Sequence, residues 1–433
     1  MDISEPRQSS FQTTRPLPLE TAQAAPFFRQ RRRLTILLCF MYVTFALVAN
    51  SWGPIFAPLA AQLSLSLGQI GLLFVAWLIG YLPGAIVGGS LLDQYGPRLV
   101  VFGAFFLMIG GIGAIYLMVT FHLSWLASLV VCAGLAGIGG GTIDASTNGF
   151  LSSMYPQQQG TALNLFTGLY PLGATLISLL DGGFLSLFHN DTRPSFLLLL
   201  CCCLLALLLV VFLPKKLHTE QGECNQSQSK AFLLRLLFQG DRQLWRFFFP
   251  LSLAILLTTG FTATIRTWTP AYLHLTYGQT AAFAAVVSGI MNGLVLGFRL
   301  LVAVLVGRIG TRLTLLLALC LATLGVLGAW GSQSNALGGT LALTVTALGL
   351  TPLVATFMAL GTESVLRASG SITGLVLSLA GVSNILWSGI FGLALTRMGS
   401  TWALLSCLLP LMCSTPLVFR LRKMHFEAPG EAT

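Results

Sequence analysis

Twelve apolar stretches follow one another along the chain, and this repetition constrains the fold more than any other feature of the sequence. A helix needs about 20 apolar residues to cross the hydrocarbon core of a bilayer. Only 8% of the residues are charged, whereas a soluble domain carries roughly 25%. We therefore expect an all-α polytopic membrane protein, because a helix satisfies its own backbone hydrogen bonds in lipid. The stretches lie near residues 34–61, 70–92, 99–120, 125–150, 161–185, 195–213, 246–274, 280–306, 313–331, 336–360, 370–395 and 401–420.

Two parts of the chain share short motifs at nearly constant spacing. Gly96-Pro97-Arg98 recurs as Gly310-Thr311-Arg312, 214 residues later, and joins two apolar stretches in both places. Trp52 recurs as Trp268, and in each case a proline follows two residues later. We therefore expect two pseudo-symmetric six-helix bundles with a site between them. The expected divisions are a cytoplasmic disordered tail (1–33), an N-terminal bundle (34–213), a cytoplasmic linker (214–245), a C-terminal bundle (246–422) and a cytoplasmic tail (423–433).

The basic residues are distributed unevenly among the connections. If the N-terminus is cytoplasmic, 19 of the 23 Lys and Arg residues fall on the cytoplasmic side, and only Arg193 and Arg397 fall on the other. Cytoplasmic loops carry such an excess of basic residues. We therefore expect a multi-pass protein of the cell (inner) membrane with both termini cytoplasmic. The net charge of +10 then sets orientation in the lipid bilayer, and no nucleic-acid partner is expected.

The first copy of the duplicated turn resembles the loop motif of the major facilitator superfamily. That motif places an acid between two glycines and a base after the second glycine. Gln94 stands where a further base is usual, and Gly307 replaces the acid in the second copy. The resemblance covers roughly residues 34–422 and implies twelve helices and alternating access. It also implies a gating role for Gly89, Asp93, Gly96, Arg98 and Arg312.

A narrower resemblance connects the fourth and fifth stretches with the L-fucose–proton symporter group. It rests on the run from Gly139 to Phe150, on Leu163-Asn164 and on Leu172-Gly173-Ala174. In that group an acid at the position of Asp144 is associated with proton coupling, so the resemblance implies a proton as a partner. Drug–proton antiporters of the superfamily usually carry an arginine midway along helix four, and this stretch has none. Efflux of a drug or amphipathic compound by proton antiport remains the alternative.

Few charged residues lie inside the apolar stretches, and each needs a reason because a charge in lipid is costly. Asp144 could take up and release a proton, or its carboxylate could simply cap a nearby hydroxyl such as that of Thr147. Arg266 cannot shed its charge, so it needs an anion from the substrate or the protein. Alternatively, Arg266 snorkels to the surface. Arg299 is expected to snorkel or to pair with Glu363.

Uncharged polar side chains at mid-span could bind a hydroxylated solute. The two tryptophans of the repeat could stack on the apolar face of a sugar, or they could belong to the aromatic belt at the membrane interface. We expect the substrate to be a small polar solute, either a sugar or an organic acid. The residues expected to bind it are Asn50, Trp52, Asn164, Arg266, Trp268, Asn292 and Asn384.

The sequence carries no signature of an enzyme. It lacks a phosphate-binding glycine-rich loop with Lys-Ser/Thr, so we expect neither ATP-driven transport nor catalytic residues. The five histidines and nine cysteines show no metal-ligand spacing, so no metal and no cofactor are expected. Together with the twelve expected spans, this predicts a secondary transporter. We expect it to function as a monomer.

Overall fold

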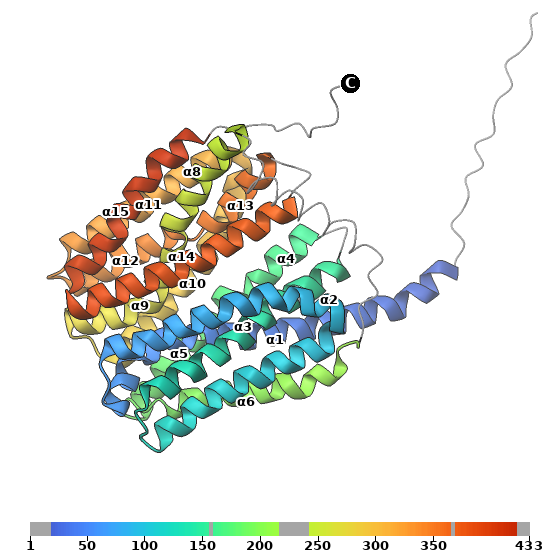
Figure 1. Ribbon diagram of the computed structural model, residues 1–433, viewed down its shortest axis with the longest axis horizontal. Helices are drawn as coiled ribbons and strands as arrows, with labels where there is room; N and C mark the ends of the chain where they lie inside the picture. The colour runs from blue at the N-terminus through green and yellow to red at the C-terminus, as the bar shows by residue number, and fades with distance from the viewer. Residues whose placement is uncertain (1–18, 156–158, 216–241, 365–368, 422–433) are drawn as a thin grey trace, which may run out of the picture.

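The computed structural model describes residues 19–155, 159–215, 242–364 and 369–421, which form helices joined by short connections (Figure 1). Figure 1 shows α1 to α6 gathered in one bundle and α8 to α15 in a second bundle beside it. Among the described residues there is no strand, which agrees with the predicted all-α class. The helices are α1 (Leu19–Leu63), α2 (Leu67–Thr120), α3 (Leu126–Met154), α4 (Gln159–Thr167), α5 (Leu169–Leu187), α6 (Arg193–Leu209), the 3-10 helix η2 (Val210–Phe212), α8 (Arg242–Thr258), α9 (Gly260–Tyr277), α10 (Ala281–Ile309), α11 (Thr311–Gly331), α12 (Ala336–Leu350), α13 (Leu353–Ser364), α14 (Ser369–Arg397) and α15 (Ser400–Arg420).

Helix α2 is a hairpin of two membrane-spanning arms. Its 54 residues would extend about 80 Å, far more than the roughly 30 Å core of a bilayer. The arms join at Gly96, whose φ of 77° and ψ of 164° lie in a region nearly restricted to glycine. Within the described ranges, 11 helices are long and apolar enough to cross a membrane, and α2 is counted among them once. Its two arms bring the total to the twelve crossings that the sequence predicts.

Both arms of α2 pack on α3 through glycines. Along the first arm, Gly80, Gly84 and Gly88 face successively later positions of α3, from 134 to 142. Along the second arm the order is reversed, since Gly111 faces position 132 and Ala104 faces position 139. The first arm is therefore parallel to α3 and the second is antiparallel to it. Small residues allow this close approach of backbones, which stabilises helix packing in lipid.

The duplicated motif has the same backbone conformation in both bundles. Gly310, between α10 and α11, has a φ of 83° and a ψ of 157°, close to the values at Gly96. We call the end of the molecule that holds these two glycines the Gly96 end. The opposite end, where α2 begins after Ser66, is called the Ser66 end.

Three spans are broken near their middle, between α4 and α5, between α8 and α9, and between α12 and α13. The α8–α9 break shows how the freed backbone groups are satisfied. Ser383 of α14 accepts a hydrogen bond from the Gly260 N–H at 2.7 Å. Ser383 and Trp387 both donate to the carbonyl oxygen of Leu256, at 2.7 and 2.8 Å. Breaks inside a membrane persist where neighbouring side chains supply such partners.

The two bundles make close contacts on the Ser66 side of their midline. A Cβ on Gly53 of α1 would lie 2.5 Å from the carbonyl oxygen of Thr267 of α9. A Cβ on Gly182 of α5 would lie 2.7 Å from a methyl group of Val286 of α10. We call these two contacts the seam. The seam brings the bundles together between the molecular centre and the Ser66 end.

The first helix begins before the predicted first span. Helix α1 starts at Leu19, and its apolar span starts at Arg31, whereas the sequence indicates a tail up to residue 33. Most of the predicted linker, 216–241, and the predicted C-terminal tail lie outside the described residues. The predicted bounds of the two bundles, the linker and the tails therefore stay predictions.

Candidate functional site

Asp144 lies in the middle of α3, ten residues before the helix ends at Met154. That places it about 15 Å from the helix end. Its carboxylate accepts a hydrogen bond from the hydroxyl of Tyr81 on α2 and one of 2.7 Å from the amide of Asn148. The hydroxyl of Thr147 instead donates to backbone carbonyls, at 2.7 Å to Ile143. The carboxylate therefore does not cap Thr147, and it faces a tyrosine of another helix.

Glycines bring Tyr81 and Asp144 together. A Cβ on Gly141 would lie 2.1 Å from the carbonyl oxygen of Tyr81, and one on Gly84 would lie 2.2 Å from that of Ile138. The backbones of α2 and α3 are therefore nearly in contact one turn from Asp144. No larger residue at these positions would allow the tyrosine hydroxyl to reach the carboxylate without a backbone shift.

Aromatic side chains of the first bundle surround this carboxylate. The Phe45 ring stacks on Tyr81 with centroids 6.2 Å apart and contacts Tyr170 at 5.8 Å. Tyr42 packs on Phe166 at 4.4 Å, and Tyr42 and Tyr170 both interact electrostatically with Asp144. The site thus combines one acid with three phenol groups and apolar rings.

Arg266 of α9 reaches this cluster from the second bundle. Its guanidinium carbon lies 5.6 Å from the centroid of the Tyr170 ring, within the range of a cation–π interaction. Its Nε donates to the carbonyl oxygen of Thr262 at 3.0 Å. Asn50 of α1 interacts with Tyr170 as well. Arg266 therefore points between the bundles and does not snorkel to the surface.

A second arginine, Arg299 of α10, crosses between the bundles in the same way. It donates to the Thr167 hydroxyl of α4 at 3.2 Å and interacts electrostatically with Tyr42 and with Arg266. Its predicted partner Glu363 has no described side chain. In the described part of the chain, the one ion pair joins Arg193 to Asp191. Neither Arg266 nor Arg299 has a carboxylate partner there.

Six side chains at this place are only partly covered by protein atoms. Asp144, Asn50, Tyr81, Tyr170, Arg266 and Arg299 are half-buried although they lie at mid-span and between the bundles. Burial of a guanidinium is costly unless an anion or hydrogen bonds compensate it. The two guanidinium groups therefore lie beside tyrosines of the first bundle, and neither is paired with a carboxylate among the described residues. We call the set Asp144, Tyr42, Tyr81, Tyr170, Arg266 and Arg299 the central cluster.

The other predicted binding residues are not joined to the central cluster by any contact that the structure describes. Trp52 packs on Trp77 inside the first bundle, at 6.0 Å. The carbonyl oxygens of the Asn292 and Asn384 side chains lack hydrogen-bond partners among the described residues, so each has a free acceptor at mid-span. The side chain of Asn164 lies outside the described residues.

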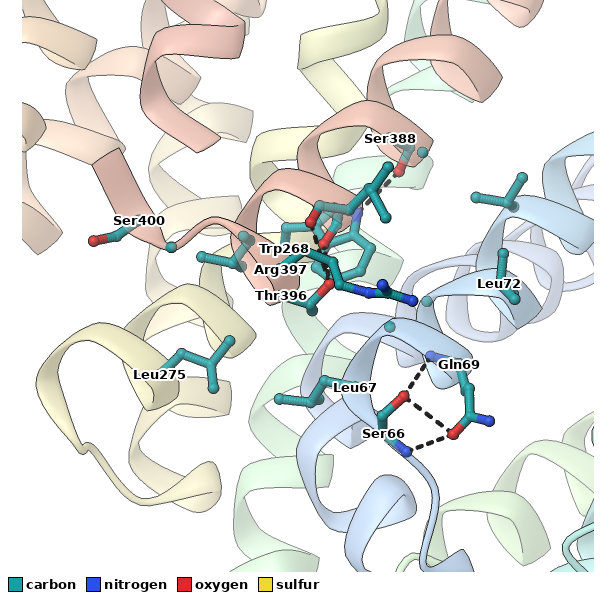
Figure 2. A pocket seen from close by; sticks show the side chains of 18 of the residues that line it. Ser66, Leu67, Gln69, Leu72, Trp268, Leu275, Ser388, Thr396, Arg397 and Ser400 are labelled. Carbon is teal, nitrogen blue, oxygen red and sulfur yellow. Dashed lines mark hydrogen bonds between the residues drawn. The ribbon is translucent and has the colours of Figure 1, made fainter. Parts of the chain in front are cut away.

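Trp268 lines a separate cavity of about 820 Å³ at the Ser66 end, between α2 and the helices α9 and α14 (Figure 2). Its indole N–H donates to Ser388 at 3.0 Å. Figure 2 shows the Arg397 side chain, which lines this cavity, extending from α14 toward the start of α2. The residues that line this cavity include none of the central cluster, so the cavity and the cluster are separate.

The predicted gating residues lie at the Gly96 end. Asp93 is exposed and Arg98 is half-buried, and Gly89 has open space around it. Arg312 lies over the Phe419 ring at 5.2 Å and donates to the carbonyl oxygen of Phe419, in the last turn of α15. A cation at a helix C-terminus stabilises that end.

Sequence reasoning missed Tyr42, Tyr81, Tyr170, Asn148 and the central position of Arg299. A tyrosine in an apolar stretch looks like an ordinary core or interface residue, because nothing local shows which helix it faces. Asn148 could have been found, since it lies four residues after Asp144 and therefore on the same helix face. In the described residues, no group of three or more His, Cys, Asp or Glu side chains could hold a metal ion.

Comparison with protein families gives one match over most of the chain. The model of the Major Facilitator Superfamily matches residues 38–388. Among curated proteins, the 3-(3-hydroxy-phenyl)propionate transporter of Escherichia coli is 31% identical over 153 residues, 35% of this chain and 36% of that protein. The hexuronate transporter of Bacillus subtilis is 30% identical over 116 residues, 27% of this chain and 26% of that protein. The matches thus span about a third and a quarter of these relatives.

Solved structures show the same fold. A D-xylose–proton symporter superposes with a TM-score of 0.72 at 16% identity, covering 90% of this chain and 97% of that one. The fucose–proton symporter of E. coli superposes with a TM-score of 0.61 at 17% identity, covering 91% of this chain and 98% of that one. Identities this low establish the architecture only.

Proposed function

The chain belongs to the major facilitator superfamily, and from that premise we propose that it is a secondary transporter that moves a small organic anion together with a proton. Alternating access would expose the central cluster first to one side of the membrane and then to the other, as the bundles rock about it. The seam lies between the cluster and the Ser66 end, so its contacts are among those that must open for access from that side.

The observation that carries the proposal is the pair of arginines, Arg266 and Arg299. Both belong to the second bundle, both reach residues of the first, and neither meets a carboxylate among the described residues. A guanidinium binds a carboxylate with two parallel hydrogen bonds. A neutral sugar would leave both charges uncompensated, so the organic acid is favoured over the sugar. The two relatives are named for carboxylate solutes, which supports this choice.

The aromatic rings in and around the central cluster favour a solute with an apolar or ring-shaped body. Phe45, Tyr170, Tyr42 and Phe166 form a continuous set of ring contacts. Tyr170 is half-buried and lies beside Arg266, whereas the other three rings are buried behind it. Rings of this kind pack on flat apolar groups with specific offset geometries. The proposed substrate is therefore a monocarboxylate with an aromatic or other compact apolar body.

Asp144 would couple the proton to this anion. Tyr170 interacts electrostatically with both Asp144 and Arg266. The carboxylate of Asp144 and the carboxylate of a bound substrate would therefore interact with the same arginine and tyrosine groups. Protonation of Asp144 removes the negative charge that would repel the substrate. The loaded cluster then holds one proton and one anion, and the transport step carries both.

The orientation follows from the positive-inside rule, and we propose that the Gly96 end is cytoplasmic. Arg31 and Arg312 lie at this end, where each donates to a carbonyl oxygen in the last turn of another helix, Met154 in α3 and Phe419 in α15. Asp93 and Arg98 would gate this side. The membrane would be the cell (inner) membrane, with the monomer as the working unit.

The test is uptake into proteoliposomes under an imposed pH gradient, with benzoate, phenylpropionate, hexuronate and a neutral pyranose as separate probes. Relative to protein-free liposomes, in which a weak acid also accumulates by diffusion of its neutral form, we expect additional gradient-driven uptake of a carboxylate by the wild type and no additional uptake by Asp144→Asn. The matched control is Asp191→Asn, which removes a carboxylate from an exposed connection and should retain uptake. Accumulation of the pyranose alone, or uphill uptake by Asp144→Asn, would contradict the proposal.

A further inference from the structure

A second carboxyl group, Asp181 on α5, is buried inside the first bundle. Sequence position near the Ser66 end suggests a solvated side chain, but the structure leaves 0% of Asp181 exposed. Neither carboxyl oxygen has a hydrogen-bond partner among the described residues. The hydroxyl groups of Ser178, one turn earlier on α5, and Ser195 of α6 are equally buried and equally unpartnered. Ser195 lies beside the carboxyl group.

In the described segments around Asp181, no charged side chain is placed to compensate a carboxylate. Helices α1, α4, α6 and α10 pack against α5. Near Asp181 these helices carry apolar residues, glycines, prolines and hydroxyls. The nearest cation along α6 is Arg193, which is engaged by Asp191 in the exposed connection. The titratable groups Tyr170 on α5, Cys203 on α6 and Arg299 on α10 lie two or more helical turns from the level of Asp181, as do Tyr42 and Cys39 on α1 and the basic residues at its start.

An isolated carboxylate is not tolerated in such a place, since its desolvation is uncompensated. A neutral carboxyl group needs only one acceptor for its O–H, and either serine hydroxyl could rotate to supply one. Hard metal cations are usually held by about six or more oxygens. Around Asp181 the structure leaves two carboxyl and two hydroxyl oxygens without a hydrogen-bond partner among the described residues. These counts favour a proton over a metal cation.

We infer that Asp181, with Ser178 and Ser195, is a second proton-binding site and that it holds a proton in this conformation at neutral pH. The site is separate from the central cluster and lies beside the seam, because the next residue, Gly182, packs on Val286 and on the Ala282 carbonyl oxygen of α10. Opening of the seam would bring water to this part of α5. The Asp181 O–H bond could then break, with its proton passing to that water and the carboxylate left behind.

The readout that tests this inference is the infrared C=O stretch of a protonated carboxyl group, measured on the purified full-length protein in lipid at pH 7. It needs no substrate, so it stays informative if the proposed transport activity fails. In the Asp144→Asn background, adding Asp181→Asn should remove one such band. Adding Asp191→Asn instead, the matched control whose carboxylate is paired with Arg193, should remove none. A band that survives Asp181→Asn overturns the inference.

Two further measurements keep the result interpretable. If the double variant does not fold, the wild type and Asp181→Asn give the same comparison, with the loss of one band expected. Asn resembles the neutral acid in shape and charge, so Asp181→Asn should melt within a few degrees of the wild type. If sodium chloride removes the band where choline chloride does not, the site binds a sodium ion in place of the proton, and the inference is wrong.

Discussion

The hydroxyl of Tyr81 donates a hydrogen bond to the carboxylate of Asp144, across the close contact between α2 and α3. Two residues that are 63 positions apart thereby form the acid–phenol pair of the central cluster. The pair lies in the region where Arg266 and Arg299 of the second bundle reach residues of the first bundle.

Removal of the Tyr81 hydroxyl should change the pH dependence of transport. Tyr81→Phe takes away a donor that stabilises the charged form of Asp144, and a hydrogen bond to a charged group contributes roughly 1.5–3 kcal/mol. Because one pH unit corresponds to about 1.4 kcal/mol, the midpoint of the uptake–pH curve should move up by about one to two units. Uptake rates between pH 5 and 9 would show the shift. An unchanged midpoint would show that the Tyr81 hydroxyl plays no part in proton coupling.

Arg266 should be required as a guanidinium and not merely as a charge. Arg266→Lys keeps the positive charge but loses the planar guanidinium that donates two parallel hydrogen bonds to a carboxylate. We expect the apparent affinity for a carboxylate substrate to fall at least about tenfold. Arg299→Lys should act in the same direction. The control is Arg193→Lys in the exposed connection, which should transport normally. Full activity of both central variants would argue against anion binding between the bundles.

Bulk at Gly141 should destabilise the protein. A Cβ there would lie 2.1 Å from the Tyr81 carbonyl oxygen, so Gly141→Leu must push α2 and α3 apart. Overpacking of this kind costs about 1–3 kcal/mol, and the thermal midpoint in detergent should fall by several degrees. Gly103→Leu, on the second arm of α2 with nothing within 4 Å of its Cβ, is the matched control. Equal melting of the two variants would contradict the packing argument.

The turn glycine between α10 and α11 should be irreplaceable. Gly310→Ala must adopt a φ of 83° and a ψ of 157°, which costs about 1–3 kcal/mol for a residue with a Cβ. Gly307→Ala, three residues earlier in a helix and with open space around it, should be neutral or slightly stabilising. Thermal melting of the two variants would reveal the difference, and a harmless Gly310→Ala would show that the turn is not strained.

Asp191 should contribute to stability only above acidic pH. Partial burial opposes its charge, but hydrogen bonds from Arg193 and Gln62 outweigh that effect and hold its pKa below the usual range. Such a group stabilises the fold above its unfolded pKa of about 3.9 and loses the contribution as pH falls through its folded pKa. Asp191→Asn should therefore melt slightly lower than the wild type at pH 7. The difference should shrink below about pH 4, and a gap that widens there would contradict the assignment.

The sequence alone determined the number and order of the spans. Twelve apolar stretches predict twelve crossings because lipid requires about 20 apolar residues for each. Gly96 and Gly310 could be matched from sequence because a turn with that backbone conformation nearly requires glycine. Asp144 could be singled out for a similar reason, since a carboxylate inside an apolar stretch is rare enough to be informative by itself.

Only the tertiary structure decided which side chains meet. Helical periodicity shows which residues share a face of one helix. The contact of Tyr81 with Asp144 depends on how closely α2 and α3 pack, and the glycines that allow this approach do not indicate in the sequence which helix they face. The sequence likewise did not determine the direction of Arg266 or the burial of Asp181. An arginine can snorkel to the surface or turn inward, and a carboxyl group near a helix end can be solvated or buried. The packing of neighbouring helices, which the sequence of one helix does not encode, decides between these outcomes.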